Sequence, residues 1–442
     1  MEDAARKIVD RLREAGHIAY FAGGCVRDLL RGETPKDFDI ATDATPEIVR
    51  KIFSRTYAVG AHFGVIVVLE DGCQFEVATF RSDGAYVDGR RPAMVHFSSP
   101  EEDARRRDFT INGMFYDSAK DEVIDYVGGR TDLEGKLIRA IGEAAERFEE
   151  DHLRMLRAIR FATVLGFEIK QETWDALVIH AAAITQISAE RIREELVRIF
   201  LSPNRVRGWD LLDQSGLLRA ILPELEVMKG CAQPEQFHPE GDVFLHTRLM
   251  LSLLRGTVSV PLVFSVLLHD VAKPVTATVD EAGRIRFNGH DRIGAEMTEQ
   301  IMERLRFSRA EIDATVEMVR QHMVFKDVPH MRVAKLKRFM ARPTFPEELE
   351  LHRVDCAGSH QMLDNYEFLL RKREEFANEP IIPPPLVRGE DLIALGLRPG
   401  PQFSEILEAV ETRQLEGALT ERGEALEWVK REYSTGERQA SG

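Results

Sequence analysis

The spacing of apolar residues changes near residue 139, and this change divides the chain into two structural classes. From His17 to about Val127, short apolar runs such as HIAYFAGG, FGVIVVLE and QFEVATF alternate with turn residues and short helical stretches. After about Arg139, apolar residues recur at helical spacing, as in HLRMLRAIRFATVLGF. We therefore predict an α+β fold in which an α/β head is followed by an essentially all-α remainder.

The length of the chain requires further division. Its 442 residues exceed the roughly 250–300 residues at which a single hydrophobic core stops growing. Breaks fall near Pro203, around KGCAQPEQFHPEGD and at EPIIPPPLVRG, because prolines cannot continue a helix. Within the head, the polar stretch from Arg81 to Pro100 is a candidate flexible loop. Four parts are expected: a head over residues 1–138, a helical neck over 139–228, a histidine-rich helical domain over 229–375 and a helical tail over 376–442.

Composition restricts location and partners. The net charge of −15 argues against a uniformly basic surface, so a nucleic-acid partner must contact a local basic segment such as RVAKLKRFMAR. No apolar run approaches the roughly 20 residues that span a bilayer, so no membrane partner is expected. The start, MEDAARKIVDRLREAG, has the pattern of a charged amphipathic helix and lacks the apolar core of a secretory signal. A cytoplasmic protein is expected, and the four scattered cysteines are expected to be reduced thiols.

Two carboxylates in KDFDIATD are the first candidate site. Asp37 and Asp39 stand two residues apart on a predicted strand, so their side chains leave the same face and can share cations. Mg²⁺ takes oxygen ligands, and two ions about 3.5–4 Å apart activate an attacking hydroxyl and neutralise a leaving pyrophosphate. Glu76, on the predicted strand QFEVATF, can supply a third carboxylate. By itself the DxD pattern is common on exposed strand faces, so its meaning depends on the residues that precede it.

Those preceding residues, YFAGGCVRDLLRG, predict a strand, a Gly23-Gly24 turn and then a helix. Backbone N–H groups at such a turn can receive phosphates beside Arg27. A Gly-Gly turn alone is ordinary, but GGCVRDLL followed by DFDIATDATPE resembles the signature of the polymerase-β-like nucleotidyltransferases. More specifically, it resembles the class II tRNA nucleotidyltransferase and bacterial poly(A) polymerase family, from about Ile18 through Leu201.

The resemblance implies a role for each matching residue. Gly24 and Arg27 would bind nucleotide phosphates, and Asp37, Asp39 and Glu76 would form the catalytic carboxylates, the two aspartates holding Mg²⁺. RRRDFTINGMFYD resembles the family's second motif, in which Arg107 and Asp108 would hold the ribose or the triphosphate. The implied reaction is the addition of C, C and A to the 3′ end of tRNA from CTP and ATP, with release of pyrophosphate.

The neck begins with a row of charged residues in EDHLRMLRAIRF. Asp151, Arg154, Arg157 and Arg160 recur every three residues, which is also common on a solvated helix face. At about 100° per residue the row drifts, so Asp151 and Arg154 lie near each other and Arg160 lies on nearly the opposite side. The segment resembles the family's EDxxR motif, in which an acid and an arginine hydrogen-bond the incoming base. Asp151 and Arg154 fill those positions, and Arg157 and Arg160 would assist nucleotide binding.

The third part contains the order H…HD…D in FLHTRLML, VLLHDVAKP and beyond, which resembles the HD phosphohydrolase superfamily. The resemblance implies four metal ligands, His246, His269, Asp270 and Asp355, with His290 and His322 available for a second ion or a substrate phosphate. Imidazole and carboxylate together suit Ni²⁺, Mn²⁺, Co²⁺, Fe²⁺ or Zn²⁺. The implied reaction is hydrolysis of a phosphomonoester or a 2′,3′-cyclic phosphate.

The tail sequence RGEDLIALGLRPGPQFSEILEAVE resembles the C-terminal helical segment of these tRNA nucleotidyltransferases, which favours tRNA as the partner. Three alternatives stay open. The first is a poly(A) polymerase or an enzyme that adds only A, because both share the head motifs. The second is an HD phosphohydrolase whose head senses a nucleotide, and the third is a noncatalytic tRNA-binding protein.

Overall fold

A computed structural model describes residues 1–57, 64–84, 94–377 and 380–433. The chain forms two compact units. The first comprises Met1–Val227 with Gly256–Val260 and Ile301–Ser308, and the second comprises Met228–Arg255, Pro261–Gln300 and Arg309–Gly442. Each unit is described by itself.

The first unit is built on a mixed sheet whose described strands follow the order β3-β4-β5-β2-β1-β8-β9. The strands are β1 (Ala19–Ala22), β2 (Asp39–Thr42), β3 (Thr56–Tyr57), β4 (Val65–Glu70), β5 (Cys73–Thr79), β8 (Phe115–Asp117) and β9 (Glu122–Ile124). β2 runs parallel to β5, with Ile40 opposite Val77, while β1 lies antiparallel to both β2 and β8. This order brings the two strands that carry the predicted catalytic carboxylates side by side.

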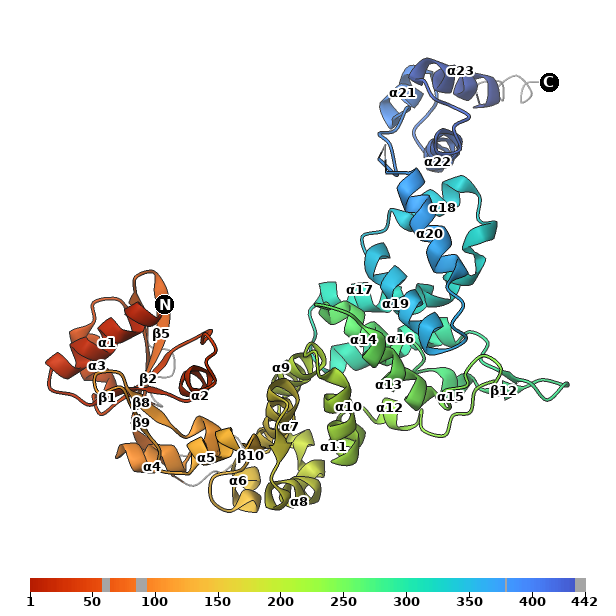
Figure 1. The fold of residues 1–442 in the computed structure, drawn as a ribbon. Coiled ribbons are helices and arrows are strands. Elements are labelled where there is room, and N and C mark those ends of the chain that lie inside the picture. The colour runs from red at the N-terminus through yellow and green to blue at the C-terminus, as the bar shows by residue number, and fades with distance from the viewer. Residues whose placement is uncertain (58–63, 85–93, 378–379, 434–442) are drawn as a thin grey trace. The chain divides into compact units, whose positions relative to one another are not determined.

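Helices α1 (Glu2–Glu14) and α3 (Pro46–Ile52) pack against the sheet (Figure 1). On α1, the residues Ala5, Ile8, Val9 and Leu12 are fully buried. They recur at the three- and four-residue spacing of one helix face, whereas the charged residues of MEDAARKIVDRLREAG take the other positions. The amphipathic helix predicted from the sequence is therefore confirmed, and its apolar face covers the sheet.

The stretch from Arg81 to Pro100 is more ordered at its ends than predicted. Strands β6 (Arg81–Asp83) and β7 (Val95–Phe97) pair antiparallel, and α4 (Pro100–Arg105) follows them. The hydroxyl of Ser99 accepts a hydrogen bond from the backbone N–H of Glu102 at 3.3 Å, which caps this helix. Local hydrogen bonding thus orders both ends, and the rest of the predicted loop, residues 85–93, lies outside the described residues.

The rest of the first unit is almost entirely helical. Its further elements are α2 (Gly24–Leu30), η2 (Thr110–Asn112), α5 (Gly129–Glu134), β10 (Leu137–Ile138), α6 (Ala144–Glu150), α7 (Leu153–Leu165), β11 (Glu168–Ile169), α8 (Gln171–His180), η3 (Ala181–Gln186), α9 (Ala189–Phe200), α10 (Arg205–Gln214), α11 (Leu217–Ile221) and α12 (Pro223–Glu226). The short strand β11 pairs with β10, because Gly166, with φ 69°, ends α7 in a left-handed turn that returns the chain. Most of α7 is buried, as expected for a central helix.

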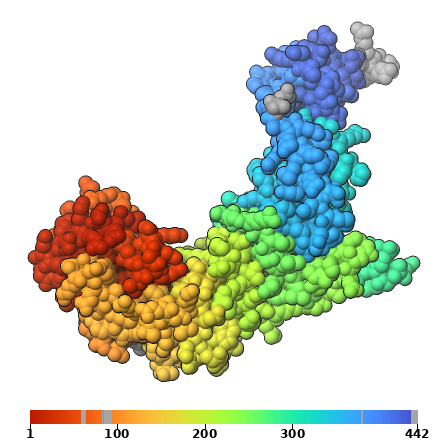
Figure 2. All heavy atoms as spheres, viewed as in Figure 1, coloured from red at the N-terminus to blue at the C-terminus, as the bar shows by residue number. Residues whose placement is uncertain are grey.

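The second unit carries the histidine-rich segment. Its elements are α13 (Val243–Leu253), α14 (Val260–Leu268) after its first residue, α15 (Lys273–Thr276), β12 (Thr278–Val279), β13 (Ile285–Arg286), α16 (His290–Arg304) up to Gln300, α17 (Arg309–Gln321), η4 (His322–His330), α18 (Val333–Met340), α19 (Phe345–Gly358) and α20 (Asp364–Glu375). The β12–β13 hairpin projects from the helices (Figure 2), and Val279 is exposed. Small β pairs therefore interrupt the predicted all-α remainder without changing its helical character.

The tail has a core of its own. It contains α21 (Gly389–Ala394), α22 (Pro401–Leu415) and α23 (Arg422–Tyr433). Leu392, Ile406, Val410 and Trp428 belong to one cluster of buried side chains there. Across the described parts of the whole chain, no helix combines the length and the apolar character needed to cross a membrane.

Candidate functional site

The predicted catalytic carboxylates lie close together where β2 begins beside β5, two interior strands of the sheet. The register that sets Ile40 opposite Val77 also brings Glu76 beside Asp39. Burial raises the pKa of Asp39 to about 6, and the negative charges of Glu76 and Asp37 act in the same direction. Strand β2 begins at Asp39, so the prediction that Asp37 lies on that strand is wrong, although its charge reaches Asp39. Three carboxylates with too little positive charge among them fit a site for hard cations such as Mg²⁺.

The glycine turn lies directly beside these carboxylates. Gly23 has φ 74° and precedes α2, as the sequence predicts. A Cβ atom at Gly23 would lie 3.0 Å from Nη1 of Arg107 and 3.9 Å from Oδ2 of Asp39. Only glycine combines this backbone angle with so close an approach. Arg27, in the first turns of α2, donates from Nη1 to Oδ1 of Asn112 at 2.8 Å.

Arg107 and Asp108 are adjacent in sequence but have different partners. Arg107 donates from Nε and Nη2 to Oδ2 of Asp103, at 3.1 and 3.0 Å. Asp108 accepts from Nε of Arg157 at 2.7 Å, which connects the head to α7 of the neck. Burial alone would raise the pKa of Asp108, but the charge and hydrogen bonds of Arg157 hold it below its usual value. Arg107 therefore faces the carboxylate site, while Asp108 joins head to neck.

Asn112 is a site residue that the sequence analysis missed. It is buried, and its side chain accepts from Arg27 at 2.8 Å and donates to Oδ1 of Asp108 at 3.2 Å. Its backbone oxygen also accepts from Nη1 of Arg107 at 3.3 Å. Through its side-chain amide and its backbone oxygen, Asn112 thus contacts three of the predicted nucleotide-binding residues. The available signal was a polar residue in the otherwise small and apolar run TINGMF.

The residues predicted to recognise the base lie at the junction of α6 and α7. Asp151 precedes α7, and its Oδ2 accepts from Nη2 of Arg191 on α9 at 2.8 Å. Arg154 donates from Nη1 to Oε2 of Glu150 at 2.5 Å. The backbone N–H of Arg154 donates to the oxygen of Asp151 at 3.0 Å, so the two residues are neighbours as predicted. Arg191, which the sequence analysis assigned no contact, holds the carboxylate of Asp151 in place.

Arg157 and Arg160 diverge, as the drift of the helical row predicts. Arg157 reaches Asp108 in the head, whereas Arg160 forms a buried ion pair with Glu195 of α9, with Nε 2.5 Å from Oε2. This ion pair therefore holds Nε of Arg160 inside the neck.

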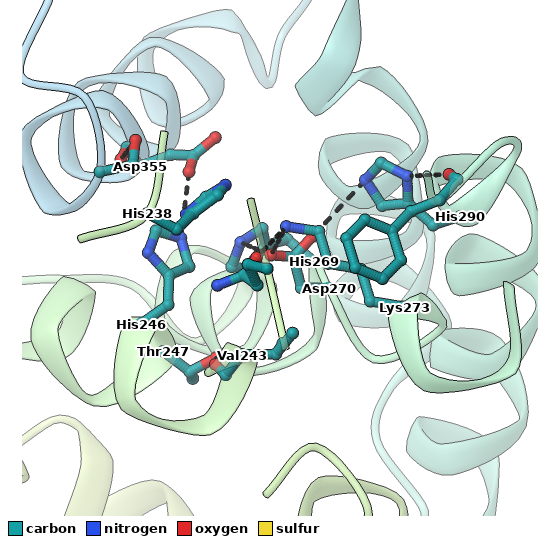
Figure 3. A network of polar contacts seen from close by, with 12 residues as sticks. His238, Val243, His246, Thr247, His269, Asp270, Lys273, His290 and Asp355 are labelled. Atoms are coloured by element: carbon teal, nitrogen blue, oxygen red, sulfur yellow. Dashed lines mark hydrogen bonds and ion pairs between the residues drawn. The ribbon is translucent and has the colours of Figure 1, made fainter. Parts of the chain in front are cut away.

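The histidines of the second unit converge as well (Figure 3). The predicted ligands come from five segments of the chain. They are His246 in α13, His269 and Asp270 directly after α14, His290 at the start of α16, His322 at the start of η4 and Asp355 in α19. Among the described residues, two groups that consist of predicted ligands each bring three ligand atoms within 4.8 Å of one another, and Asp270 belongs to both. One contains His246 and His269, and the other contains His290 and His322.

Backbone contacts fix which ring nitrogen of each histidine faces the centre. Nδ1 of His269, His290 and His322 lies 3.0, 2.7 and 2.6 Å from the carbonyl oxygen three residues earlier. A carbonyl only accepts, so Nδ1 donates and Nε2 of a neutral ring presents a lone pair. Nε2 of His290 lies 3.1 Å from Nε2 of His322, and two lone pairs at that distance repel unless a cation or proton lies between them. This arrangement fits imidazole ligation of a metal ion.

Protonation equilibria in the cluster agree with this interpretation. Burial together with the nearby rings of His269 and His290 lowers the pKa of His322 to about 4, so this ring is neutral. Burial would also lower the pKa of His246, but hydrogen bonds with Asp355 and Glu240 outweigh it and raise the value to about 9. Nε2 of His246 lies 3.1 Å from Oδ1 of Asp355, and a bound metal ion would replace the proton between them.

Two further residues support the cluster and were not predicted. Glu240 accepts from Nδ1 of His246 at 2.7 Å and contacts Nδ1 of His238 at 2.9 Å through the same oxygen. Lys273 lies 2.7 Å from Oδ2 of Asp270. Lys273 was visible in the sequence, three residues after Asp270 in HDVAKP. Glu240 lies in the irregular segment before α13, where no periodic pattern marks it.

Comparisons with known families agree with the geometry of both sites. Residues 19–139 match the poly(A) polymerase head domain, residues 166–229 match a probable RNA-binding and SrmB-binding site of polymerase A, and residues 243–356 match the HD domain. The predicted resemblance to these families is therefore confirmed for each of the three segments.

Individual curated proteins that resemble the chain in sequence are named CCA-adding enzymes. A CCA-adding enzyme of Streptococcus pyogenes is 45% identical over 205 residues, which are 46% of this chain and 51% of the relative. One from Geobacillus kaustophilus is 44% identical over 224 residues, which are 50% of this chain and 55% of the relative. The matched region thus spans about half the length of these curated relatives.

Solved structures extend the similarity of fold over nearly the whole chain. The crystal structure of a Bacillus stearothermophilus CCA-adding enzyme in complex with CTP has a TM-score of 0.75, 27% identity and 98% coverage of both chains. A Thermotoga maritima CCA-adding enzyme complexed with tRNA has a TM-score of 0.60 at 20% identity, covering 96% of this chain and 94% of that one.

The contact between Glu240 and His246 predicts a change in metal affinity. A carboxylate that accepts from Nδ1 makes the imidazole a better metal ligand, so Glu240→Gln should weaken binding of Ni²⁺ by about 10- to 100-fold. The measurement is competition with a chromogenic chelator, using the full chain. Glu235→Gln alters an exposed carboxylate of the same segment and should bind Ni²⁺ as the unchanged chain does. Equal affinities in the two variants would show that Glu240 does not support the metal ligand.

Proposed function

We propose that this chain, which combines a poly(A) polymerase head domain, an RNA-binding segment of the same family and an HD domain, adds C, C and A to the 3′ end of tRNA. The observation that carries the proposal is the convergence of Asp37, Asp39 and Glu76 beside Gly23 and Arg107, in a unit that also holds the EDxxR residues. The relatives named CCA-adding enzyme support it. A tRNA substrate makes the cytoplasm the expected location.

The proposal assigns one task to each part of the chain. The head over residues 1–138 performs nucleotidyl transfer, and the neck over 139–228 recognises the base. The domain over 229–375 hydrolyses a phosphate ester, and the tail over 376–442 contacts tRNA. Lysines and arginines of the second unit suit the sugar-phosphate backbone of a tRNA arm, which proteins recognise mainly by shape.

In the head, the residues would act on CTP or ATP as follows. Gly24, Arg27 and Arg107 hold the triphosphate, and Asp37 and Asp39 hold Mg²⁺ with Glu76 as the third carboxylate. Mg²⁺ supplies charge neutralisation at the reacting phosphate when it is bound. The 3′ hydroxyl of tRNA attacks the α-phosphate, and pyrophosphate leaves. Asp108 contributes indirectly, because its ion pair with Arg157 fixes the neck against the head.

In the neck, Asp151 and Arg154 would distinguish C and A from U and G. A carboxylate accepts from an exocyclic amino group, which C and A both carry. A guanidinium donates to a ring nitrogen that accepts in C and A but donates in U and G. Arg191 orients the carboxylate of Asp151 through an ion pair, and Glu150 holds the guanidinium of Arg154 in the same way.

In the HD domain, we propose a metal-dependent phosphatase or 2′,3′-cyclic phosphodiesterase. The ligands are His246, His269, Asp270 and Asp355, with His290 and His322 for a second ion or the substrate phosphate. Mixed imidazole and carboxylate donors favour Ni²⁺, Mn²⁺ or Co²⁺ over Mg²⁺. The supporting observation is the set of Nε2 atoms that backbone carbonyls hold toward the centre.

A poly(A) polymerase or an enzyme that adds only A is the second candidate, because the head matches the poly(A) polymerase family model. An HD phosphohydrolase with a nucleotide-sensing head is less well supported, since a sensor has no need for three converging carboxylates. Sequencing the nucleotides added to tRNA distinguishes the proposed CCA addition from this second candidate.

The first prediction concerns the product. With tRNA that lacks its 3′ end, CTP alone should give addition of C, and CTP with ATP should complete C, C and A, as read by sequencing. Asp39→Ala should abolish addition and pyrophosphate release while tRNA binding persists, because the variant loses a metal ligand but no basic surface. Glu14→Ala, an exposed carboxylate of α1, is the control. Addition of A alone, or normal addition by Asp39→Ala, would contradict the proposal.

The second prediction concerns base selection. Asp151→Asn and Arg154→Ala should lower incorporation of C and A and raise the relative incorporation of U or G. Each mismatched hydrogen bond costs on the order of 1–3 kcal/mol, so the ratios should change by about tenfold or more. Steady-state incorporation of all four nucleotides is the measurement, with Glu149→Gln on the exposed side of α6 as control. Unchanged ratios in folded variants would mean that the pair does not recognise the base.

The third prediction separates the two activities. His269→Ala with Asp270→Ala should remove hydrolysis of 2′,3′-cyclic AMP in the presence of Ni²⁺ or Mn²⁺ but leave nucleotide addition intact, because both residues belong to the second unit. Asp39→Ala should show the opposite pattern. Circular dichroism establishes that each variant is folded, and loss of both activities in a folded double variant would show that the sites are not independent.

A further inference from the structure

One buried aromatic ring lies among three of the arginines that carry predicted nucleotide roles. The ring is that of Phe161, on α7, which is 6% exposed. The guanidinium carbon atoms of Arg160, Arg157 and Arg27 lie 3.9, 5.4 and 5.5 Å from its centroid. Arg157 and Arg160 belong to the neck, whereas Arg27 belongs to the head. The ring therefore contacts cations from both parts of the proposed polymerase centre, although the predicted motifs assign it no role.

The spacing along α7 accounts for two of the three arginines. Arg157 and Phe161 are four residues apart, so their side chains lie on one face of the helix. Arg160 directly precedes Phe161, and its guanidinium lies over the ring while its Nε donates to Oε2 of Glu195 on α9. Helical geometry thus brings both neck arginines to this ring.

The third arginine reaches the ring from the head. Nε of Arg27 donates to Oδ1 of Asp28 and its Nη1 donates to Oδ1 of Asn112, both at 2.8 Å. A Cβ atom at Gly24 would lie 3.6 Å from Nη2 of Arg27, so the guanidinium lies at the turn that is predicted to receive phosphates. The Arg27 side chain is buried for the most part. It is therefore held between the glycine turn and the ring of Phe161.

A second aromatic ring fixes the orientation of the first. Phe109 is fully buried, and its ring is nearly perpendicular to that of Phe161, with centroids 5.8 Å apart. The backbone N–H of Phe109 donates to Oδ1 of Asp108 at 2.8 Å, and Oδ2 of the same carboxylate accepts from Arg157. The residues that hold α7 against the head therefore also fix the position of the Phe161 ring.

The charges around the ring give a physical reason for an aromatic side chain at this position. Each arginine has an acidic partner, which is Asp28, Asp108 or Glu195, yet the three guanidinium groups repel one another. Burial lowers the pKa of Arg160 below its ordinary value, so its charge is poorly hydrated. The face of a phenyl ring attracts a cation within about 6 Å, most strongly where water is excluded. An aliphatic side chain of similar volume would fill the space without this attraction.

We propose that Phe161 is a positioning residue for nucleotidyl transfer, whose ring holds the guanidinium of Arg27 in the orientation that binds the triphosphate. The ring acts on the phosphate end of the nucleotide, so its effect is the same for CTP and ATP. Asp151 and Arg154, in contrast, act on the base. The proposal rests on the nucleotidyl transfer proposed for the head.

The test changes the charge distribution of the ring and keeps its shape. Phe161 is replaced by mono-, di- and trifluorophenylalanine, because fluorine withdraws electron density from the ring face. The full chain also carries His269→Ala and Asp270→Ala, which removes nucleotide chemistry in the second unit. KM for both CTP and ATP should rise stepwise to about tenfold, because a weaker cation–π contact costs binding energy. The value of kcat should stay within about twofold, because binding shared by substrate and transition state changes KM alone.

Phe53 is the matched control. This buried ring of the head has the guanidinium carbon of Arg11 4.4 Å from its centroid, but neither residue belongs to the proposed site. The same fluorination at Phe53 should leave KM for CTP unchanged. Phe161→Leu should raise KM at least as much as trifluorination does, and thermal unfolding shows whether this variant folds. The fluorinated chains keep the proposal testable if it does not.

An Arg27→Ala background identifies the arginine through which the ring acts. Calorimetry gives the affinity for CTP in each chain. In this background, fluorination at Phe161 should no longer change the affinity, because the guanidinium that the ring holds is gone. A fluorination effect that persists there would overturn the assignment to Arg27.

The remaining outcomes separate this proposal from the function on which it rests. A CTP affinity that fluorination at Phe161 leaves unchanged, or that fluorination at Phe53 lowers equally, would overturn the role of the ring even if the chain adds C, C and A. A loss seen only in Phe161→Leu would do the same, because the shape of the side chain alone would then matter. If the chain adds no nucleotide, the polymerase function fails, and a stepwise loss of CTP affinity confined to Phe161 still supports the positioning of Arg27.

Discussion

The ion pair between Asp108 and Arg157 is the contact on which the proposed polymerase centre depends. Nε of Arg157 lies 2.7 Å from Oδ2 of Asp108, and a second contact, from Nη2 of Arg154 to the oxygen of Arg106 at 3.3 Å, lies one helical turn away. Partners this well matched geometrically can hold a partly buried pair together despite the cost of desolvation. They keep α7 in one position against the head. These contacts therefore set the distance from the proposed catalytic carboxylates to the residues proposed to recognise the base.

Much of this arrangement follows from the sequence. The parallel pairing that brings Glu76 to Asp39 needed only two predicted strands and a family motif. The H…HD…D order located His246 and His269, and the resemblance added His290 and His322, but His238 was not predicted. Hydrophobic periodicity and short motifs located these site residues because both depend only on residues that are close together in the sequence. The rotation of 100° per residue also predicted on which face of α7 each arginine lies.

The rest could not be predicted because it depends on partners distant in sequence. Asn112, Arg191 and Glu240 occupy ordinary polar positions, and each acquires a role only when folding brings it to Arg27, to Asp151 or to His246. The short pair of β10 and β11 escaped prediction for a similar reason, since a two-residue strand has no period to detect. A motif therefore identifies the main residues of a site, whereas the residues that hold them in place are found only in the structure.

The two proposed metal centres are prepared for their ions in different ways. Around Asp39, the nearby positive charge does not balance the negative charge of the carboxylates, and the pKa of Asp39 is therefore raised. A bound hard cation would reduce this repulsion between the carboxylates. In the HD cluster, backbone carbonyls and Glu240 fix the imidazole tautomers before any ion arrives. Oxygen donors alone select Mg²⁺ weakly and by charge, whereas oriented imidazoles select transition metals by donor type. Donor chemistry would therefore let one chain keep the two proposed metal-dependent activities apart in the same solution.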